Sequence, residues 1–385
     1  MNAKKVLLIL GLAGFVVMAD NWVVSPILPS ISKDLGVNVA SAALIITAYM
    51  LPFGLFQLIF GYLADKFGKR QVISFAMVFF TISTGLCALG MGLTDLAVYR
   101  ALTGIFAASV MPISLALIGD IFPLNERQAA IGTFMGISFL GQGLSMAIGG
   151  SIAYFLNWRG VFAVYALLSV MATILLLTIG KNIPSTKNQN SKVFAPYLNL
   201  IKNPLSLKIY ILVIFEGIFL IGSFSFLGGY IKSTFDFNNF LIGIIMTAFG
   251  VMAVIGGRVS GKLSAKVGRK KTILIGLTSA VLASIIFVAL GNILAILIIG
   301  IGLLGLGFMI VHSTFLTIAT EFAAKARGVA MSLVAFCFMG GGGLGTAIGS
   351  RIVENSSLLT LFTVYGVGLL ALIFAVLLVK KSFIV

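Results

Sequence analysis

The stretch GYLADKFGKR at residues 61–70 returns in altered form as GKLSAKVGRK at residues 261–270. Four positions are identical between the two copies, namely Gly61/Gly261, Leu63/Leu263, Lys66/Lys266 and Gly68/Gly268. The same offset of 200 residues aligns GQGLSMAIGGSI from Gly141 with GGGLGTAIGSRI from Gly341. Self-similarity at one fixed offset indicates a duplicated unit. We therefore expect two halves of common origin.

The chain that carries these copies is unusually apolar. Of its 385 residues, 60% are hydrophobic and 9% are charged, and the mean hydropathy is +1.16. A soluble domain carries about 25% charged residues, so the composition excludes a soluble protein. A membrane-spanning helix needs about 20 apolar residues, and twelve such segments nearly fill the chain. The sequence therefore predicts an all-α membrane protein with 12 transmembrane helices.

A polar stretch at residues 181–207 divides the spans into six and six. We predict an N-terminal six-helix bundle at residues 1–180, a cytoplasmic linker at 181–207 and a C-terminal six-helix bundle at 208–385. Most of the 26 Lys and Arg residues lie in the loops on one side; the exceptions are Lys33, Arg100, Arg159, Lys232 and Arg351. Because positive loops stay cytoplasmic, both termini are expected there, in a multi-pass protein of the cell membrane. The net charge of +16 then predicts contact with membrane lipid, and no nucleic acid is expected.

Two parallel six-helix repeats place a binding site between them and support alternating access. Residues 61–70 also resemble the signature G-x-L-a-D-r-x-G-r-r of the major facilitator superfamily, and the chain is similar to its twelve-helix drug or metabolite efflux branch. The resemblance implies the major facilitator fold and proton-coupled export of small lipophilic or amphipathic compounds. We expect a monomer that is not an enzyme and needs neither cofactor nor metal, with the proton gradient as its energy source. A lipid or glycolipid flippase, a sugar, nucleoside or siderophore exporter, and a membrane sensor or scaffold remain as alternatives.

In this superfamily the loop after the second span acts as a cytoplasmic gate latch. The resemblance assigns that role to Gly61, Asp65, Lys66, Gly68, Lys69 and Arg70. In the second copy Ala265 replaces Asp65. We therefore expect the acidic latch in one half only.

Only two of the ten carboxylates fall inside apolar segments, Asp20 in the first span and Glu216 in the seventh. A charged side chain at that depth costs about 2.5 to 3.5 kcal/mol on insertion scales. A carboxylate that is ionised when wet and protonated when enclosed can carry a proton, so we predict that Asp20 and Glu216 couple transport to protons, with Asp20 the stronger candidate. The alternative for Asp20 is a structural hydrogen bond within its own bundle, beside Asn21.

Arg100 and His312 are two further candidates for proton coupling. Arg100 and Gly104 match a pattern of this superfamily in which a buried arginine is associated with coupling. Alternatively, Arg100 extends to the outer interface near Asp95. His312 is the single histidine; it could relay protons or belong to an ordinary polar patch, and alone it cannot form a metal site.

The fifth span resembles the marker of the efflux branch in its glycines, Gly132, Gly141, Gly149 and Gly150. Ser145 and Met146 stand where that branch has a Gly-Pro pair, so the proline kink often linked to antiport is not expected. The Asn157-Trp158-Arg159 corner after this span also resembles the branch, and Trp158 is expected to be an interfacial anchor.

Aromatic and soft side chains near the centre of the spans are the candidates for a substrate cavity, because such a lining suits an amphipathic compound. Most of the 32 Phe and 14 Met residues must pack helices or face lipid, so we expect about half of the candidates to line the cavity. The candidates are Asn21, Trp22, Tyr49, Phe53, Gln57, Met111, Gln142, Met146, Phe219, Ser223, Phe226, Met246, Phe249 and Phe338.

Overall fold

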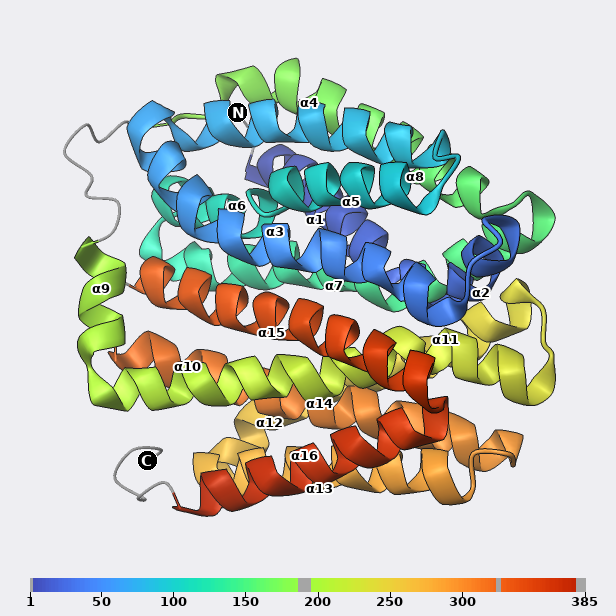
Figure 1. Cartoon of the computed structure of the whole chain (residues 1–385). Helices are drawn as coiled ribbons and strands as arrows, with labels where there is room; N and C mark the ends of the chain where they lie inside the picture. Colours follow the sequence, from blue (N-terminus) through green and yellow to red (C-terminus); the bar gives the residue numbers. More distant parts are fainter. Residues whose placement is uncertain (1–2, 186–194, 323–326, 379–385) are drawn as a thin grey trace.

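The computed structural model describes residues 3–185, 195–322 and 327–378, and all regular structure in these ranges is helical (Figure 1). Twelve of the described stretches are long and apolar enough to cross a membrane, as predicted. Helices suit such a sequence because each backbone N–H and C=O is satisfied within its own segment. Part of the predicted linker, residues 186–194, and both chain ends lie outside the described residues.

The first half holds the first six spans. Its helices are α1 (Ala3–Trp22), α2 (Val24–Asp34), α3 (Val39–Phe67), α4 (Lys69–Ala88), α5 (Leu93–Ala107), α6 (Val110–Ile121), α7 (Leu124–Phe155) and α8 (Trp158–Leu177). A 3-10 turn, η1 (Gly180–Asn182), and the short helix α9 (Ala195–Lys202) follow.

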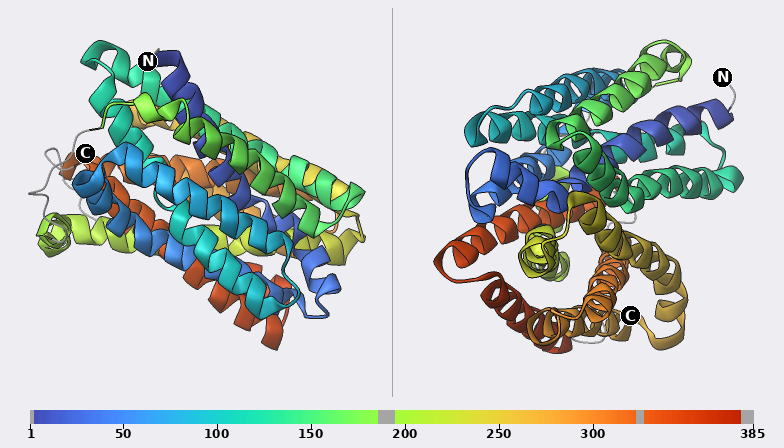
Figure 2. Two further views of the ribbon diagram at one scale, coloured as in Figure 1. Left: turned by 90° about the horizontal axis from the view of Figure 1, so that it is seen from above. Right: turned by 90° about the vertical axis from the view of Figure 1, so that its right-hand side faces the viewer.

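The second half repeats this order. Its elements are α10 (Pro204–Glu216), the π-helical turn η2 (Gly217–Ile221), α11 (Gly222–Phe235), α12 (Asn239–Val267), α13 (Arg269–Ala289), α14 (Leu294–Phe322), α15 (Arg327–Asn355) and α16 (Leu358–Leu378). The two halves lie against each other as two groups of helices (Figure 2).

Three spans are broken, and a proline explains two of the breaks. Pro26 has no N–H group to bond the carbonyl of Trp22, and α1 ends at Trp22. Pro112 likewise cannot bond the carbonyl of Ala108, and α5 ends one residue earlier. The seventh span instead contains η2 directly after Glu216. Single π-helical turns occur frequently at functional sites. Both buried carboxylates thus lie within three residues of a break in their span.

Gly68 and Gly268 end the matched helices α3 and α12 with φ angles of 100° and 83°. A side chain disfavours this conformation, whereas glycine adopts it without strain. The repeated glycine of the two opening motifs is therefore explained by the same tight turn in both halves.

The halves meet chiefly through α3 against α15 and α7 against α12. We call the end of the molecule where α9 lies the linker end, and the other the far end (Figure 1). Towards the far end, the Ser25 hydroxyl donates to the Phe224 carbonyl at 2.8 Å, and the Ser30 hydroxyl bonds the Asn239 side chain at 2.8 Å. A Cβ on Gly228 would lie 2.0 Å from the Ser25 carbonyl oxygen. The far end is therefore closed by direct contact between the halves.

Trp158 was expected to be an interfacial anchor, but it is buried. It is 2% exposed, and its indole N–H donates to Asp34 at 3.0 Å. Arg159 binds the same carboxylate. The corner after the fifth span therefore joins α8 to the end of α2.

Candidate transport site

A cavity of about 220 Å³ lies between the two halves, on the linker-end side of the far-end contacts. Both halves contribute walls to this central cavity, and most of the lining side chains are apolar. Six of the fourteen cavity candidates line it: Trp22, Phe53, Gln57, Met111, Gln142 and Phe338. His312, a candidate for proton coupling, lines it as well.

The other cavity candidates lie elsewhere. Tyr49, Met146, Phe226, Met246 and Phe249 are fully buried in helix packing. The ring centroids of Phe249 and Trp22 are 5.4 Å apart, so Phe249 packs against a residue that lines the cavity. Asn21, Phe219 and Ser223 also lie outside the lining, and Ser223 donates to the carbonyl of Phe219.

A larger set of lining residues was not predicted from the sequence. They are Met18, Pro112, Leu115, Met135, Phe139, Phe308, Met309, Ser313, Leu316, Met331, Ser332, Val334, Ala335 and Met339. Helical spacing was the signal that could have found many of them, because residues three or four apart share a face. Met135 and Phe139 precede Gln142 at that spacing, and Met309 and Leu316 flank His312.

In the first half, Asp20 forms a tight ion pair. Its carboxylate accepts from the Arg100 guanidinium at 2.7 Å, with Asp20 0% and Arg100 1% exposed. The guanidinium also lies 4.2 Å from the centre of the Tyr49 ring, within range of a cation–π contact. The alternative in which Arg100 reaches the outer interface is therefore wrong. Asp95 instead accepts from the N–H of Gly92 at the start of α5.

In the second half, Glu216 lies beside His312. One carboxylate oxygen is 3.3 Å from Nδ1 of His312, which is ion-pair range, but the pair lacks the alignment of a hydrogen bond. Neither oxygen of Glu216 has a hydrogen-bond partner among the described residues. Glu216 is fully buried, whereas His312 is 19% exposed and lines the central cavity.

The two carboxylates therefore relate differently to the cavity. Neither lines it. Asp20 pairs with Arg100, which does not line the cavity either, whereas Glu216 contacts His312, which does.

The gate-loop residues form similar contacts in both halves. Lys69 lies 2.7 Å from Asp120 at the end of α6, and 3.8 Å from Asp65. Arg269, at the matched position, pairs with Glu321 near the end of α14. The acid within the loop, Asp65, has no counterpart because Ala265 matches it. Each half nevertheless has an acidic partner for the loop cation, and that acid comes from the fourth span. The N–H of Arg70 donates to Ser185 beyond η1.

Within the described residues, no cluster of three or more His, Cys, Asp or Glu side chains could hold a metal ion. A cavity that lies between two helical bundles and is closed at one end is the arrangement of a secondary transporter.

The family model of the Major Facilitator Superfamily matches residues 10–346 and, in a second match, 209–383. The chain belongs to this superfamily and is a multi-pass membrane transporter, not an enzyme.

Two relatives and one solved structure show how far the likeness extends. A probable sugar efflux transporter of Helicobacter pylori (strain P12) is 28% identical over 94% of this chain and 92% of its own length. The puromycin resistance protein pur8 of Streptomyces alboniger is 34% identical over 42% of this chain and 32% of its own length. The crystal structure of a mutant of the nucleoside transporter NupG matches 98% of this chain and 99% of its own with a TM-score of 0.81; at 16% identity this likeness concerns the fold.

Proposed function

We propose that the protein exports small, lipophilic or amphipathic aromatic compounds across the cell membrane in exchange for protons. The observation that carries this proposal is the contact between Glu216 and His312 at the wall of an apolar cavity. In this proposal the linker end faces the cytoplasm, as the loop charges suggest.

The lining of the central cavity supports the substrate class. Phe and Met side chains dominate it, and Gln57, Gln142 and His312 are among its few strongly polar groups. Apolar walls with a few placed polar groups are typical of sites for drug-sized ligands, and flexible Met side chains adapt to several shapes. Puromycin, the compound in the name of one relative, has this amphipathic and aromatic character.

Closure at the far end supports the transport cycle. With the Ser25 and Ser30 contacts in place, a compound can load only from the linker end. Rocking of the bundles at residues 1–180 and 208–385 about the cavity would break these contacts and open the far end. The breaks beside Asp20 and Glu216 place both acids where the spans can bend.

Glu216 is better suited than Asp20 to carry the proton. Protonating Asp20 would leave the Arg100 guanidinium buried without its counter-charge, which costs several kcal/mol. Glu216 can instead take a proton from His312, and either member of that pair can be neutral. We therefore propose Glu216, and not Asp20, as the proton carrier. The Asp20–Arg100 ion pair would instead hold α1 against α5.

The available energy is sufficient for export. One proton crossing about 150 mV supplies roughly 3.5 kcal/mol. That energy corresponds to a concentration ratio of several hundredfold for a neutral solute, since each 1.4 kcal/mol is about tenfold.

Transport by purified protein in proteoliposomes tests the proposal. Vesicles loaded at acidic pH and diluted into alkaline buffer are expected to accumulate labelled puromycin. Glu216→Gln should abolish this accumulation but keep puromycin exchange at equal pH, because exchange needs no net proton transfer. Glu354→Gln, an exposed carboxylate, is the matched control and should behave as wild type. Accumulation by Glu216→Gln, or puromycin flux that ignores the gradient, would contradict the proposal.

A sugar exporter is the second candidate, because the Helicobacter relative matches along 94% of this chain. Lactose in the same vesicles separates the two. Gradient-driven uptake of lactose without puromycin would replace the lipophilic substrate with a sugar. Movement of a labelled lipid alone would indicate a flippase, and flux of none of the three would reject the proposal.

A further inference from the structure

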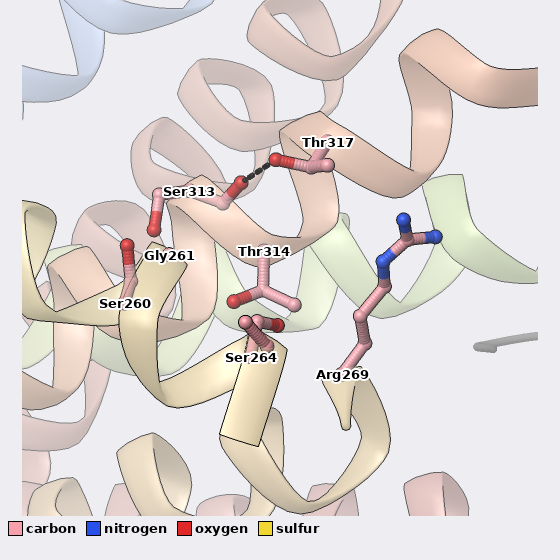
Figure 3. Close-up of a pocket in the computed structure, with 8 residues that line it drawn as sticks. Ser260, Gly261, Ser264, Arg269, Ser313, Thr314 and Thr317 are labelled. Atoms are coloured by element: carbon pink, nitrogen blue, oxygen red, sulfur yellow. Dashed lines mark hydrogen bonds between the residues drawn. The ribbon is translucent and has the colours of Figure 1, made fainter. Parts of the chain in front are cut away.

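A second cavity, of about 330 Å³, lies within the C-terminal half between α12, the start of α13 and α14 (Figure 3). We call it the hydroxyl cavity, because five of its lining residues carry hydroxyl groups. Its lining residues are Ser260, Gly261, Ser264, Ala265, Arg269, Ser313, Thr314 and Thr317. The Ser260 and Ser313 hydroxyls point toward each other across the space between α12 and α14 (Figure 3).

The hydroxyl cavity adjoins the central cavity. Ser313 lines both of them. The preceding residue, His312, lines the central cavity and contacts Glu216. The two cavities therefore meet at Ser313, which is next in sequence to the histidine that contacts the proposed proton carrier.

The hydroxyl groups suit bound water. Ser260 and Ser313 donate to carbonyls of their own helices, Gly257 at 2.9 Å and Met309 at 2.6 Å, and each oxygen keeps lone pairs that can accept from water. The buried hydroxyl of Ser264 has no hydrogen-bond partner among the described residues, and buried water commonly satisfies such groups. A space of 330 Å³ holds on the order of ten waters.

The internal repeat provides a comparison within the same chain. In the first half, Phe60, Ala64, Ile113 and Leu117 occupy the positions that match Ser260, Ser264, Ser313 and Thr317. Only the fifth position, Thr314, has a hydroxyl counterpart, Ser114. Four of the five hydroxyl groups of the lining are therefore specific to the half that contains Glu216 and His312, whereas in the first half Asp20 is already paired with Arg100.

We propose that the hydroxyl cavity conducts protons between the linker end and the Glu216–His312 pair through bound water, by a route separate from the substrate path. This inference rests on the proposed proton coupling. A lipophilic compound in the central cavity displaces water, and protons move along chains of hydrogen-bonded water. In this scheme a proton leaves the Glu216 carboxyl for the His312 imidazole and then passes to water at Ser313. Arg269, a charged residue of the lining, forms an ion pair with Glu321 near the end of α14.

Cysteine labelling tests whether the cavity is hydrated. The two native cysteines, Cys87 and Cys337, are first replaced by Ala. Thr314→Cys is then compared with Ser114→Cys, its counterpart in the first half, using a charged methanethiosulfonate reagent on protein in nanodiscs. We expect Thr314→Cys to react at least about tenfold faster, because the reagent attacks thiols that water reaches, and saturating puromycin should leave this rate unchanged. Equal rates, or protection by puromycin, would overturn the separate route.

Filling the cavity tests its role in proton transfer. Gly261 lines the cavity, and a Cβ added to it meets no atom within 4 Å, so Gly261→Leu introduces a side chain there from an open position. Proton movement driven by a puromycin gradient, read by a pH dye inside the vesicles, should fall about tenfold if the side chain displaces the water. Puromycin exchange at equal pH should keep its rate. Gly136→Leu, whose Cβ also meets open space, is the control.

The outcomes separate this inference from the proposed function. Normal proton movement in Gly261→Leu would overturn the inference while leaving proton coupling intact. An equal loss of exchange and proton movement would assign the cavity to the substrate path and would also overturn it. Absence of gradient-driven flux in the wild type would instead reject the proposed function.

Discussion

Each half of the molecule buries one acid beside one base, and the two contacts differ in kind. Asp20 and Arg100 are both sealed from solvent at a 2.7 Å contact, and the Tyr49 ring lies against the guanidinium. Glu216 and His312 meet at 3.3 Å without hydrogen-bond alignment, and the histidine reaches the cavity. Arginine stays charged whereas histidine titrates near neutral pH. The first contact is therefore suited to hold a structure, and the second to change its charge.

Removing the base from the first half should produce the largest effect. Arg100→Met leaves the Asp20 carboxylate buried without a partner, and breaking a buried ion pair costs about 3 to 5 kcal/mol. We expect a corresponding fall in the free energy of unfolding in detergent. Adding Asp20→Asn should restore most of the loss, because the remaining amide carries no charge. If Arg100→Met proves as stable as wild type, the contact is not structural.

Removing the acid from the second half should barely affect stability. Glu216→Gln removes the carboxylate from a contact that lacks hydrogen-bond alignment, so we expect the free energy of unfolding to change by less than about 1 kcal/mol, although driven transport is lost. The same unfolding experiment in detergent measures this change in free energy. A loss as large as that of Arg100→Met would make the two acids equivalent and would remove the distinction between the halves.

The gate-loop ion pairs should behave alike in the two halves. Lys69→Met and Arg269→Met each remove a partly exposed ion pair, and such pairs contribute about 0 to 1 kcal/mol. We expect small and equal losses of stability, with similar changes in transport rate. An effect of Lys69→Met alone would favour the one-sided latch that the sequence suggested.

The smallest expected effect is on thermal stability at acid pH, and it comes from Asp34 at the far end. Hydrogen bonds from Arg159 and Trp158 hold the pKa of Asp34 below its ordinary value. A lowered folded-state pKa stabilises the fold above the unfolded value of about 3.9, and this contribution is lost as the pH falls through the folded value. Asp34→Asn should therefore flatten a shallow decline in thermal stability below that pH. An unchanged decline would show that Asp34 does not contribute to it.

The sequence predicted the spans and the repeat because hydropathy and an offset of 200 residues are linear signals. It predicted neither the pairing of Asp20 with Arg100 nor that of Glu216 with His312. All four residues were candidates, but helices that are apolar on every side give no periodicity from which to read the direction that a residue faces. The proline breaks at Pro26 and Pro112 were readable in principle, whereas nothing comparable marks η2.

The acidic gate partners were missed for a related reason. At the offset of 200 residues the position of Asp65 is matched by Ala265, so matched positions show no shared acid in the loop. The partners that the two halves share, Asp120 and Glu321, stand one residue out of register. Glu321 therefore reaches the same place in the fold although the residue matched to Asp120 is not an acid.

Proton release on substrate binding tests the central claim most directly. Purified protein in lightly buffered detergent solution is mixed with puromycin, and a pH dye records the protons released while bound puromycin is counted. The account predicts release by the wild type and by Asp34→Asn, and none by Glu216→Gln that still binds puromycin. Release that persists in Glu216→Gln, or binding by the wild type without release, would contradict it.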